Sequence, residues 1–397
     1  MSKLIHLLVS LSFFTMAACS VDNPFENEKK PGQKPLPSAV DARASLTSEL
    51  YVRNFSELPL NASLPEQPWT DSYWPHADGG IAYRWNESSG VSSDDRRAYT
   101  LASYEDLKRK DLARLSPAEK LDLYRGRYDY PATRSERART QVLKTVRSHE
   151  LFDPNFKIAA WNGLCHAWAM ASLNFKEPGT VTLRSPQGLV IPFGSSDIKA
   201  LLMYAVDQSL QAKKPSMLGG RCTNDFEALK KKRDSGAITS EEFAAQVKAG
   251  GCQDVDAGAF HIALANQIGI LKEGFIADVT RDQEVWNQPV FAYRSTVISE
   301  SSEISLTAQA GTVKEVTVLT AMFYGVETSR QWNAHPAERS RDKKQYSYRL
   351  QLNAEGDIIG GVWLTQDRPD FIWKQKPSET GSEEWETIMK IYQASVK

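Results

Sequence analysis

A change of hydrophobic period along the chain limits the fold more than any other feature. Three segments in the last third alternate or are rich in β-branched and aromatic residues, as strands are: 313–327, 345–352 and 357–365. The Ala-Glu-Gly-Asp run at 354–357 is a hairpin turn signal. Helical spacing dominates the preceding part, and helices followed by strands favour an α+β architecture with an antiparallel sheet.

The expected helices carry recognisable end signals. Ser116, Pro117 and Glu119 supply an N-cap, a proline at the first helical position and a capping box. The helix expected over 135–148 is strongly basic, and it is interpreted as a solvent-exposed face. The spacing predicts helices over 104–115, 116–125, 135–148 (the basic one), 195–213, 225–248 (a hairpin turning at 235–236) and 382–396.

The N-terminus indicates an exported lipoprotein. Residues 4–18 are apolar but too short to span a membrane, which is typical of a signal peptide. Ala17 and Ala18 precede Cys19, as in a bacterial lipobox, so Cys19 is the expected lipidation site and mature N-terminus. Ser20 follows instead of aspartate, which predicts an outer-membrane lipoprotein of the cell envelope; an ordinary secretory signal is the alternative.

Composition argues against one class of binding partner, and the sequence pattern suggests how the chain is divided into segments. The 397 residues carry a net charge of −1 and no long basic run, which makes nucleic acid a poor candidate partner. The aromatic, proline-bound run at 68–75 is expected to dock on the main body as an extended arm. We expect a signal peptide (1–18), a flexible tether (19–65), the arm with a helical extension (66–148), the domain with the candidate chemistry (149–375) and a C-terminal helix (376–397).

Cysteine usage singles out one thiol. Exported proteins oxidise spare thiols. Cys222 and Cys252 lie in matching glycine contexts and are expected to form a disulfide, with two free thiols as the alternative. Because Cys19 is assigned to lipid, Cys165 is left unpaired in an oxidising compartment, and such a thiol needs a functional reason.

The residues around Cys165 predict a nucleophile at the start of a helix. Apolar residues from Leu164 to Phe175 recur at helical spacing, and Asn162 or Gly163 is a suitable N-cap. Backbone N–H groups of a first turn stabilise a thiolate and can donate to an oxyanion. This arrangement is typical of papain-like enzymes, and a small buried structural cysteine is the alternative.

A general base and a group that orients it are expected downstream. His261 lies among small apolar residues in a helix over 256–269, or else in a strand, and a buried neutral imidazole can accept a thiol proton. Asp278, near the end of an apolar strand, is favoured as the orienting acid over Asn287. A core histidine and ordinary turn or cap contacts are the alternatives. His166 is read as a packing or substrate-facing residue because adjacent helix positions diverge.

Several stretches of the chain resemble the transglutaminase elicitor family, which contains secreted oomycete cell-wall transglutaminases and marine-bacterial relatives. The resemblance covers roughly 66–375. It rests on the segments 68–75, 161–169 (Trp-Asn-Gly-Leu-Cys-His-Ala-Trp-Ala), 258–261, 278–290, 358–363 and 369–373.

The resemblance implies a papain-like core, in which the nucleophile helix packs on an antiparallel sheet, and a triad of Cys165, His261 and Asp278. Asn287 and Asn162 are secondary candidates. The resemblance also implies stimulation by calcium, without assigning ligands, whereas the acyl-transfer chemistry itself needs no cofactor.

Two positions depart from the family pattern. Asp256-Ala257 stands in place of Asn-Pro and Val362 in place of glutamate, which bears on local geometry and calcium affinity rather than on the triad. We predict a protein-glutamine γ-glutamyltransferase that acts on protein or peptide substrates from a lipid anchor in the membrane. A papain-like cysteine protease and a non-catalytic surface lipoprotein are the alternatives.

Overall fold

The computed structural model describes residue 46 and residues 51–210, 215–221, 226–249, 254–280, 284–379 and 381–396. The helices within them are α1 (Ser93–Arg97), α2 (Tyr104–Leu107), α3 (Pro117–Tyr124), α4 (Pro131–Thr140), α5 (Cys165–Asn174), α6 (Ser195–Leu210), α7 (Phe226–Asp234), α8 (Ser240–Ala249), α9 (Ala257–Leu264) and α10 (Glu383–Ser395). The strands are β1 (Asn61–Ser63), β2 (Val181–Arg184), β3 (Val190–Phe193), β4 (Ser216–Gly219), β5 (Phe275–Asp278), β6 (Asn287–Ser301), β7 (Lys314–Gly325), β8 (Arg341–Leu352), β9 (Ile358–Trp363) and β10 (Phe371–Lys374).

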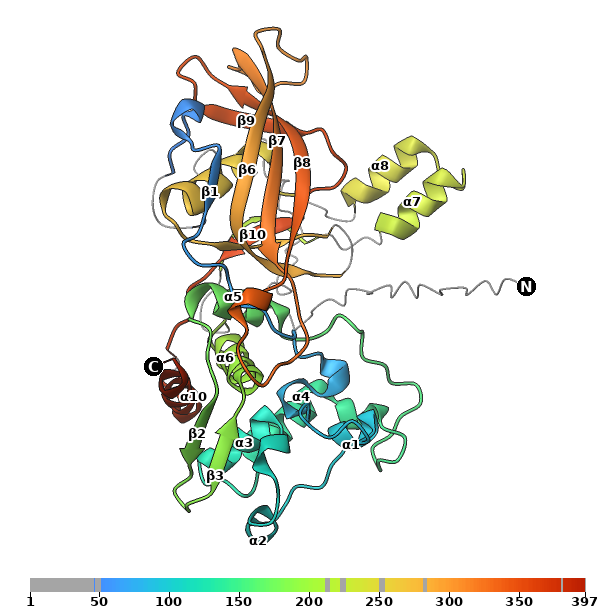
Figure 1. Ribbon diagram of the computed structural model, residues 1–397. Helices are drawn as coiled ribbons and strands as arrows, with labels where there is room; N and C mark the ends of the chain where they lie inside the picture. The colour runs from blue at the N-terminus through green and yellow to red at the C-terminus, as the bar shows by residue number, and fades with distance from the viewer. Residues whose placement is uncertain are drawn as a thin grey trace, which may run out of the picture.

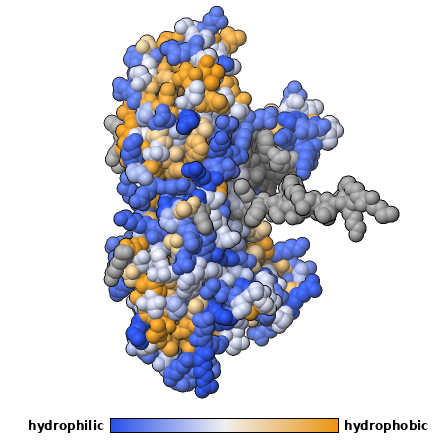
Figure 2. Space-filling view, in the orientation of Figure 1, coloured by the Kyte–Doolittle hydropathy of each residue, from blue (hydrophilic) through white to orange (hydrophobic). Residues whose placement is uncertain are grey.

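These elements separate into two bodies that meet at α5, and together they give an elongated molecule (Figure 1). The helical body comprises α1–α6, α10 and the β2–β3 hairpin, and the sheet body comprises the remaining strands with α9. The α7–α8 hairpin projects to one side of the molecule (Figure 1). Figure 2 shows hydrophobic residues gathered on both bodies and a mainly hydrophilic band between them.

The sheet body is an antiparallel sheet, as the alternating segments predict. Its described strands follow the order β4-β10-β5-β6-β7-β8-β9, and β1 pairs with β6. The longest ladders join β6 to β7 and β7 to β8. Helix α5 packs on β5 and β6, whereas α9 packs on β8 and β9. This division determines which histidine can reach which strand.

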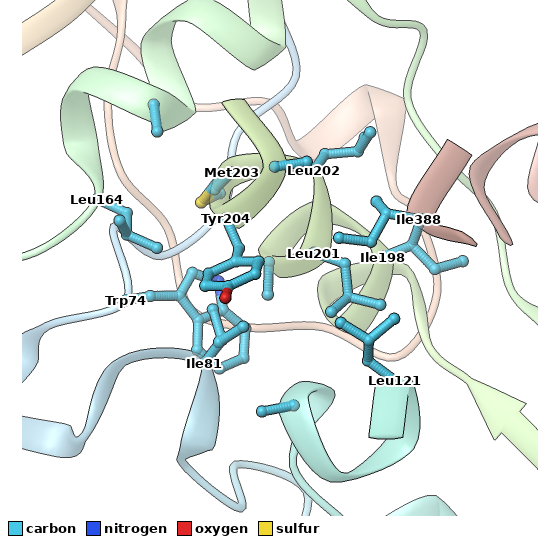
Figure 3. Close-up of a cluster of buried hydrophobic side chains, with 14 of the residues drawn as sticks. Trp74, Ile81, Leu121, Leu164, Ile198, Leu201, Leu202, Met203, Tyr204 and Ile388 are labelled. Atoms are coloured by element: carbon cyan, nitrogen blue, oxygen red, sulfur yellow. The ribbon is translucent and has the colours of Figure 1, made fainter. Parts of the chain in front are cut away.

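The core of the helical body forms around α6, whose residues are nearly all buried. Leu201, Met203 and Tyr204 of α6 meet Trp74 of the arm and Leu164, which precedes α5 (Figure 3). The arm at 68–75 is therefore extended and buried in the core, as expected. Its burial fixes the loop that leads into α5.

Most predicted elements are confirmed, with shifted ends. Ser116 caps α3 with the predicted capping box, and Gly236 turns the α7–α8 hairpin at φ +75°. The predicted helix over 104–115 is broken into α2 and a 3-10 helix that Asp111 caps. The basic helix begins earlier, at Pro131, and ends at Thr140, because Gln141 adopts a left-handed conformation before the 3-10 helix η5 (Val142–Thr145).

The predicted tether is wrong at its C-terminal end. Residues 61–63 pair with β6, and Leu58 is buried in the sheet body, so the chain joins the fold well before residue 66. The predicted signal peptide, Cys19 and the Cys222–Cys252 pair lie outside the described residues and stay predictions.

Candidate active site

Cys165 is the first residue of α5 and is fully buried. The helix begins as predicted, but Leu164 occupies the cap position instead of Asn162 or Gly163. A side chain at Gly163 is excluded, since a Cβ atom there would lie 2.6–2.7 Å from the ring and carbonyl oxygen of Tyr73. This tight approach places the arm against the residues that precede the helix.

The arm holds the start of α5 through its backbone. The N–H of Leu164 donates to the carbonyl of Tyr73 at 2.6 Å, and the N–H of His76 donates to the carbonyl of Asn162 at 2.8 Å. Two hydrogen bonds from a buried segment fix both sides of Gly163 and therefore the position of Cys165. The main-chain carbonyl of Asn162 is part of this support, and a catalytic role of its side chain stays a prediction.

Asn287 of β6 is the polar side chain that faces the sulfur of Cys165. Its Nδ2 lies 3.7 Å from Sγ, and its Oδ1 accepts a hydrogen bond from Trp373 Nε1 at 2.8 Å. Since the indole can only donate, it orients the amide with the NH₂ group toward the sulfur. The carbonyl oxygen of Val285 lies 3.8 Å from the same sulfur.

Asp278 holds the turn that carries Asn287. Its Oδ1 accepts hydrogen bonds from the backbone N–H of Trp286 at 3.0 Å and from the hydroxyl of Thr280 at 3.1 Å. Asp278 and Asn287 are also partners in the β5–β6 ladder. The carboxylate that the sequence assigned to a histidine thus bonds Thr280 after β5 and Trp286 before β6.

Cys165 is bonded in a disulfide, which contradicts the expectation of an unpaired thiol. The other three cysteines of the chain, Cys19, Cys222 and Cys252, lie outside the described residues. The sulfur in this state has no proton to lose and cannot act as a nucleophile until the bond is reduced.

His261 belongs to a buried polar chain inside the sheet body. Asp256 caps its helix as predicted, and a π-helical turn continues to Ile270. The imidazole Nδ1 lies 2.7 Å from the Tyr348 hydroxyl, which in turn lies 2.6 Å from the hydroxyl of Thr320. Burial lowers the pKa of His261 to about 4, so the ring is neutral at pH 7.

The structure does not bring His261 to Cys165. The polar chain of His261 ends at Ser295, whose Oγ lies 2.7 Å from that of Thr320. Ser295 is eight residues along β6 from Asn287, which corresponds to roughly 26 Å of strand. Helix α9 packs on β8 and β9 rather than beside α5, so the predicted Cys165–His261 pair and its orientation by Asp278 are not formed.

His166 forms a hydrogen bond with a buried carboxylate. Its Nε2 lies 2.8 Å from Asp207 Oδ1 of α6, so His166 ties the first turn of α5 to the helical body. Asp207, Tyr73 and Trp373 also support this site, and no role at the site was predicted for them. An aspartate among the apolar residues of the helix over 195–213 was the available signal for Asp207.

Glu327 is a second carboxyl group that the sequence did not single out. It accepts hydrogen bonds from the side-chain amide of Gln288 at 3.1 and 3.2 Å, and burial raises its pKa to about 7. Gln288 follows Asn287 on β6, and successive strand residues face opposite sides. Glu327 therefore lies behind the strand that presents Asn287 to Cys165.

The described residues offer no ready metal centre. They contain no group of three or more His, Cys, Asp or Glu side chains placed to hold a metal ion, and stimulation by calcium stays a prediction. None of the helices in the described ranges combines the length and the apolar character that crossing a membrane requires.

A family model and a solved structure match most of the chain. A model described as "Transglutaminase elicitor" matches residues 45–385. The crystal structure of the GP42 transglutaminase from Phytophthora sojae superimposes with a TM-score of 0.58 at 20% identity, over 87% of this chain and 94% of that one. No curated protein sequence matches. The structural likeness supports the mixed fold of helices and antiparallel sheet, whereas the papain-like core stays a prediction.

Proposed function

Because the chain belongs to the transglutaminase elicitor family, we propose that it transfers acyl groups from glutamine side chains to amines through a thioester on Cys165. The observation that carries this proposal is the position of Cys165. It is the first residue of a buried helix, and the Asn287 amide lies 3.7 Å from its sulfur.

The proposed chemistry has two balanced steps. The Cys165 sulfur bonds to the carbonyl carbon of a glutamine carboxamide, the C–N bond breaks, and ammonia leaves with the thiol proton. A lysine amine then attacks the thioester, forming an amide and returning the proton to the sulfur. Water in place of the amine would give hydrolysis instead.

Residues of this chain would contribute orientation and charge stabilisation. First-turn N–H groups of α5 and the Asn287 Nδ2 group are donors for the oxyanion of the tetrahedral intermediate. Asp278 and Trp373 hold the Asn287 segment, and the arm holds the cysteine. We assign no base, because the His261 imidazole is engaged in the sheet body.

Activity is expected only after reduction, since Cys165 is held in a disulfide. The test incubates the full chain, with and without dithiothreitol, with a glutamine-donor protein and a dansyl-labelled amine. The reduced protein should incorporate the amine, and Cys165→Ser should lower incorporation about 1000-fold or more. Asn287→Ala should lower kcat about 100-fold, as loss of one oxyanion donor does.

A matched control tests whether these losses are chemical. Ser172→Ala changes a buried side chain of the same helix that bonds only to the Ala169 carbonyl, and it should leave amine incorporation within about threefold. Full activity of Cys165→Ser would end the proposal. Cleavage of the donor protein by the reduced enzyme, without amine incorporation, would identify a protease.

The disulfide itself favours a second candidate, a non-catalytic surface protein in which Cys165 is structural. A fully buried, bonded cysteine is what that role requires. The two candidates separate in a thiol-reactivity profile of the reduced, folded protein. Rapid alkylation of Cys165 by iodoacetamide at neutral pH supports the acyltransferase, whereas resistance together with absent amine incorporation supports the structural role.

A further inference from the structure

A cavity of about 290 Å³ lies at the C-terminal end of α4, outside the candidate active site. It forms because Gln141 takes a left-handed conformation (φ 53°) and turns η5 back against the helix. Leu143 from η5 and Leu151 from the following segment meet Ala138 of α4 to make its apolar floor. The basic helix of the sequence thus borders a hollow, which a purely solvated face would not do.

The rim of this cavity is cationic. Arg134, Arg137 and Lys144 line it, and none of the described lining residues is acidic. Each cation hydrogen-bonds to a neutral oxygen: Arg134 to the Asp129 carbonyl at 2.8 Å, Arg137 to the Tyr99 carbonyl at 3.0 Å and Lys144 to the side chain of Gln141 at 2.7 Å. Arg137 also lies 4.1 Å from the centre of the Tyr99 ring and Lys144 lies 5.0 Å from that of Phe156, while Arg127 and, less strongly, Arg134 lower the pKa of the nearby Asp129. Aromatic rings and carbonyl oxygens do not neutralise a cation, so the rim keeps a net positive charge that an anion can meet.

Apolar side chains beside the rim are exposed. Leu151 is 54% exposed and the adjacent Phe152 is 37% exposed. Exposed apolar groups that adjoin a hollow and are ringed by charge mark contact surfaces in soluble proteins. The apolar floor and the cationic rim together fit a ligand that carries an apolar group and several negative charges.

We propose that this cavity docks an acidic polypeptide segment that inserts one bulky apolar side chain. The volume accommodates an aromatic side chain. Arg134 to Gln141 spans about 10 Å of helix, and an extended chain covers that length in about three residues. Carboxylates on either side of a central apolar residue therefore face the cations while that residue enters the floor.

The experiment measures binding of a fluorescein-labelled dodecapeptide, with one phenylalanine flanked by glutamates, to the full chain by fluorescence anisotropy. The double variant R134E/K144E and the variant Leu151→Ser should each weaken Kd about tenfold or more. The charge control Lys343→Glu, an exposed β8 residue, should stay within about twofold. Circular dichroism of each variant checks that it is folded.

Control peptides and lipid vesicles test whether the cavity selects an acidic peptide with an apolar side chain. A peptide with lysines in place of the glutamates, and one with alanine in place of phenylalanine, should bind about tenfold more weakly. Equal binding of either control, or an unchanged Kd for R134E/K144E, overturns the proposal. The protein could instead be retained on phosphatidylglycerol vesicles, lose this retention in R134E/K144E, and fail to bind the acidic peptide. That result also overturns the proposal and assigns the surface to lipid. None of these readouts depends on acyl transfer.

Discussion

The two bodies of the molecule bury polar groups in different ways. The helical body encloses ion pairs, Lys120–Asp197 at 2.5 Å, with both side chains fully buried, and Arg84–Glu119 at 2.6 Å. A buried hydrogen bond of 2.8 Å between His166 and Asp207 lies in the same body. In the sheet body, a chain of neutral groups runs from Ser295 through Thr320 and Tyr348 to His261. The helical body therefore contains a fully buried ion pair, whereas the polar chain around His261 in the sheet body is made of neutral groups.

This difference bears on the two residues that the sequence paired as nucleophile and base. Burial by itself would raise the pKa of Asp207, yet its hydrogen bond with His166 and the charge of Arg139 hold that pKa below the usual value. The helix that begins at Cys165 is thus anchored to α6 by a buried hydrogen bond to a carboxylate. His261 lies among neutral partners that favour an uncharged core residue, which is the alternative the sequence analysis left open.

The largest effect is expected from breaking the buried pair of the helical body. Lys120→Met keeps the length of the side chain but leaves the Asp197 carboxylate without its counter-charge. Loss of one partner of a buried pair lowers the free energy of unfolding by about 4 kcal/mol. Urea denaturation should report this, while the exposed control Lys110→Met should change it by less than about 0.5 kcal/mol. Equal effects of both variants would remove the contrast between the bodies.

The next largest effect is the loss of folding stability that protonation of His261 should cause at acid pH. The unfolded chain binds a proton at this histidine below pH 6.5, whereas the folded chain does so only near pH 4. Its neutral state therefore supports folding above pH 6.5, and that support is lost as the pH falls toward 4. The shift corresponds to about 3 kcal/mol over this window.

The variant His261→Gln isolates this contribution from other titrating groups, among them His76, whose pKa burial and Arg139 lower to about 3. Urea denaturation at pH 7, 5.5 and 4.5 should show the stability of the variant rising relative to the unmodified protein as the pH falls. A constant difference between the two proteins would mean that His261 titrates normally and is not enclosed as described.

Local signals explain what the sequence could predict. The capping box of α3, the Asp256 cap of α9 and the turn at Gly356 all depend on residues within a few positions of one another. The start of α5 was predicted for the same reason. Because the interacting residues are close in sequence, their types and spacing are enough to predict these interactions.

The relation between His261 and Cys165 could not be predicted, because it depends on sheet register. Their separation follows from which strands α9 and α5 contact, and the β6–β7 ladder shifts register between Val290 and Ala292. A spacing of residues along the chain carries no information on such long-range pairing. Likewise, the disulfide of Cys165 could not be read from matching glycine contexts around other cysteines.

A third prediction compares two buried tyrosines of β8. Tyr348→Phe removes the hydroxyl that joins His261 to Thr320 and leaves both without that partner, which should cost about 2 kcal/mol. The Tyr346 hydroxyl has no hydrogen-bond partner within the described ranges, so Tyr346→Phe should be neutral or slightly stabilising. Thermal and urea denaturation measure both. Equal losses would show that ring packing, rather than the polar chain, stabilises the sheet body.

The smallest effect concerns a charged pair on the surface of the sheet body. Lys344 Nζ lies 2.9 Å from Asp367 Oδ2, but the side chains are 32% and 51% exposed, so water screens the attraction. Lys344→Gln should lower the free energy of unfolding by about 0.5 kcal/mol or less, and this loss should vanish in about 1 M sodium chloride. Urea denaturation at low and high salt measures it. A larger loss that persists in salt would show that ion pairs also support the sheet body, and the distinction between the two bodies would then rest on His261 and its hydroxyl partners alone.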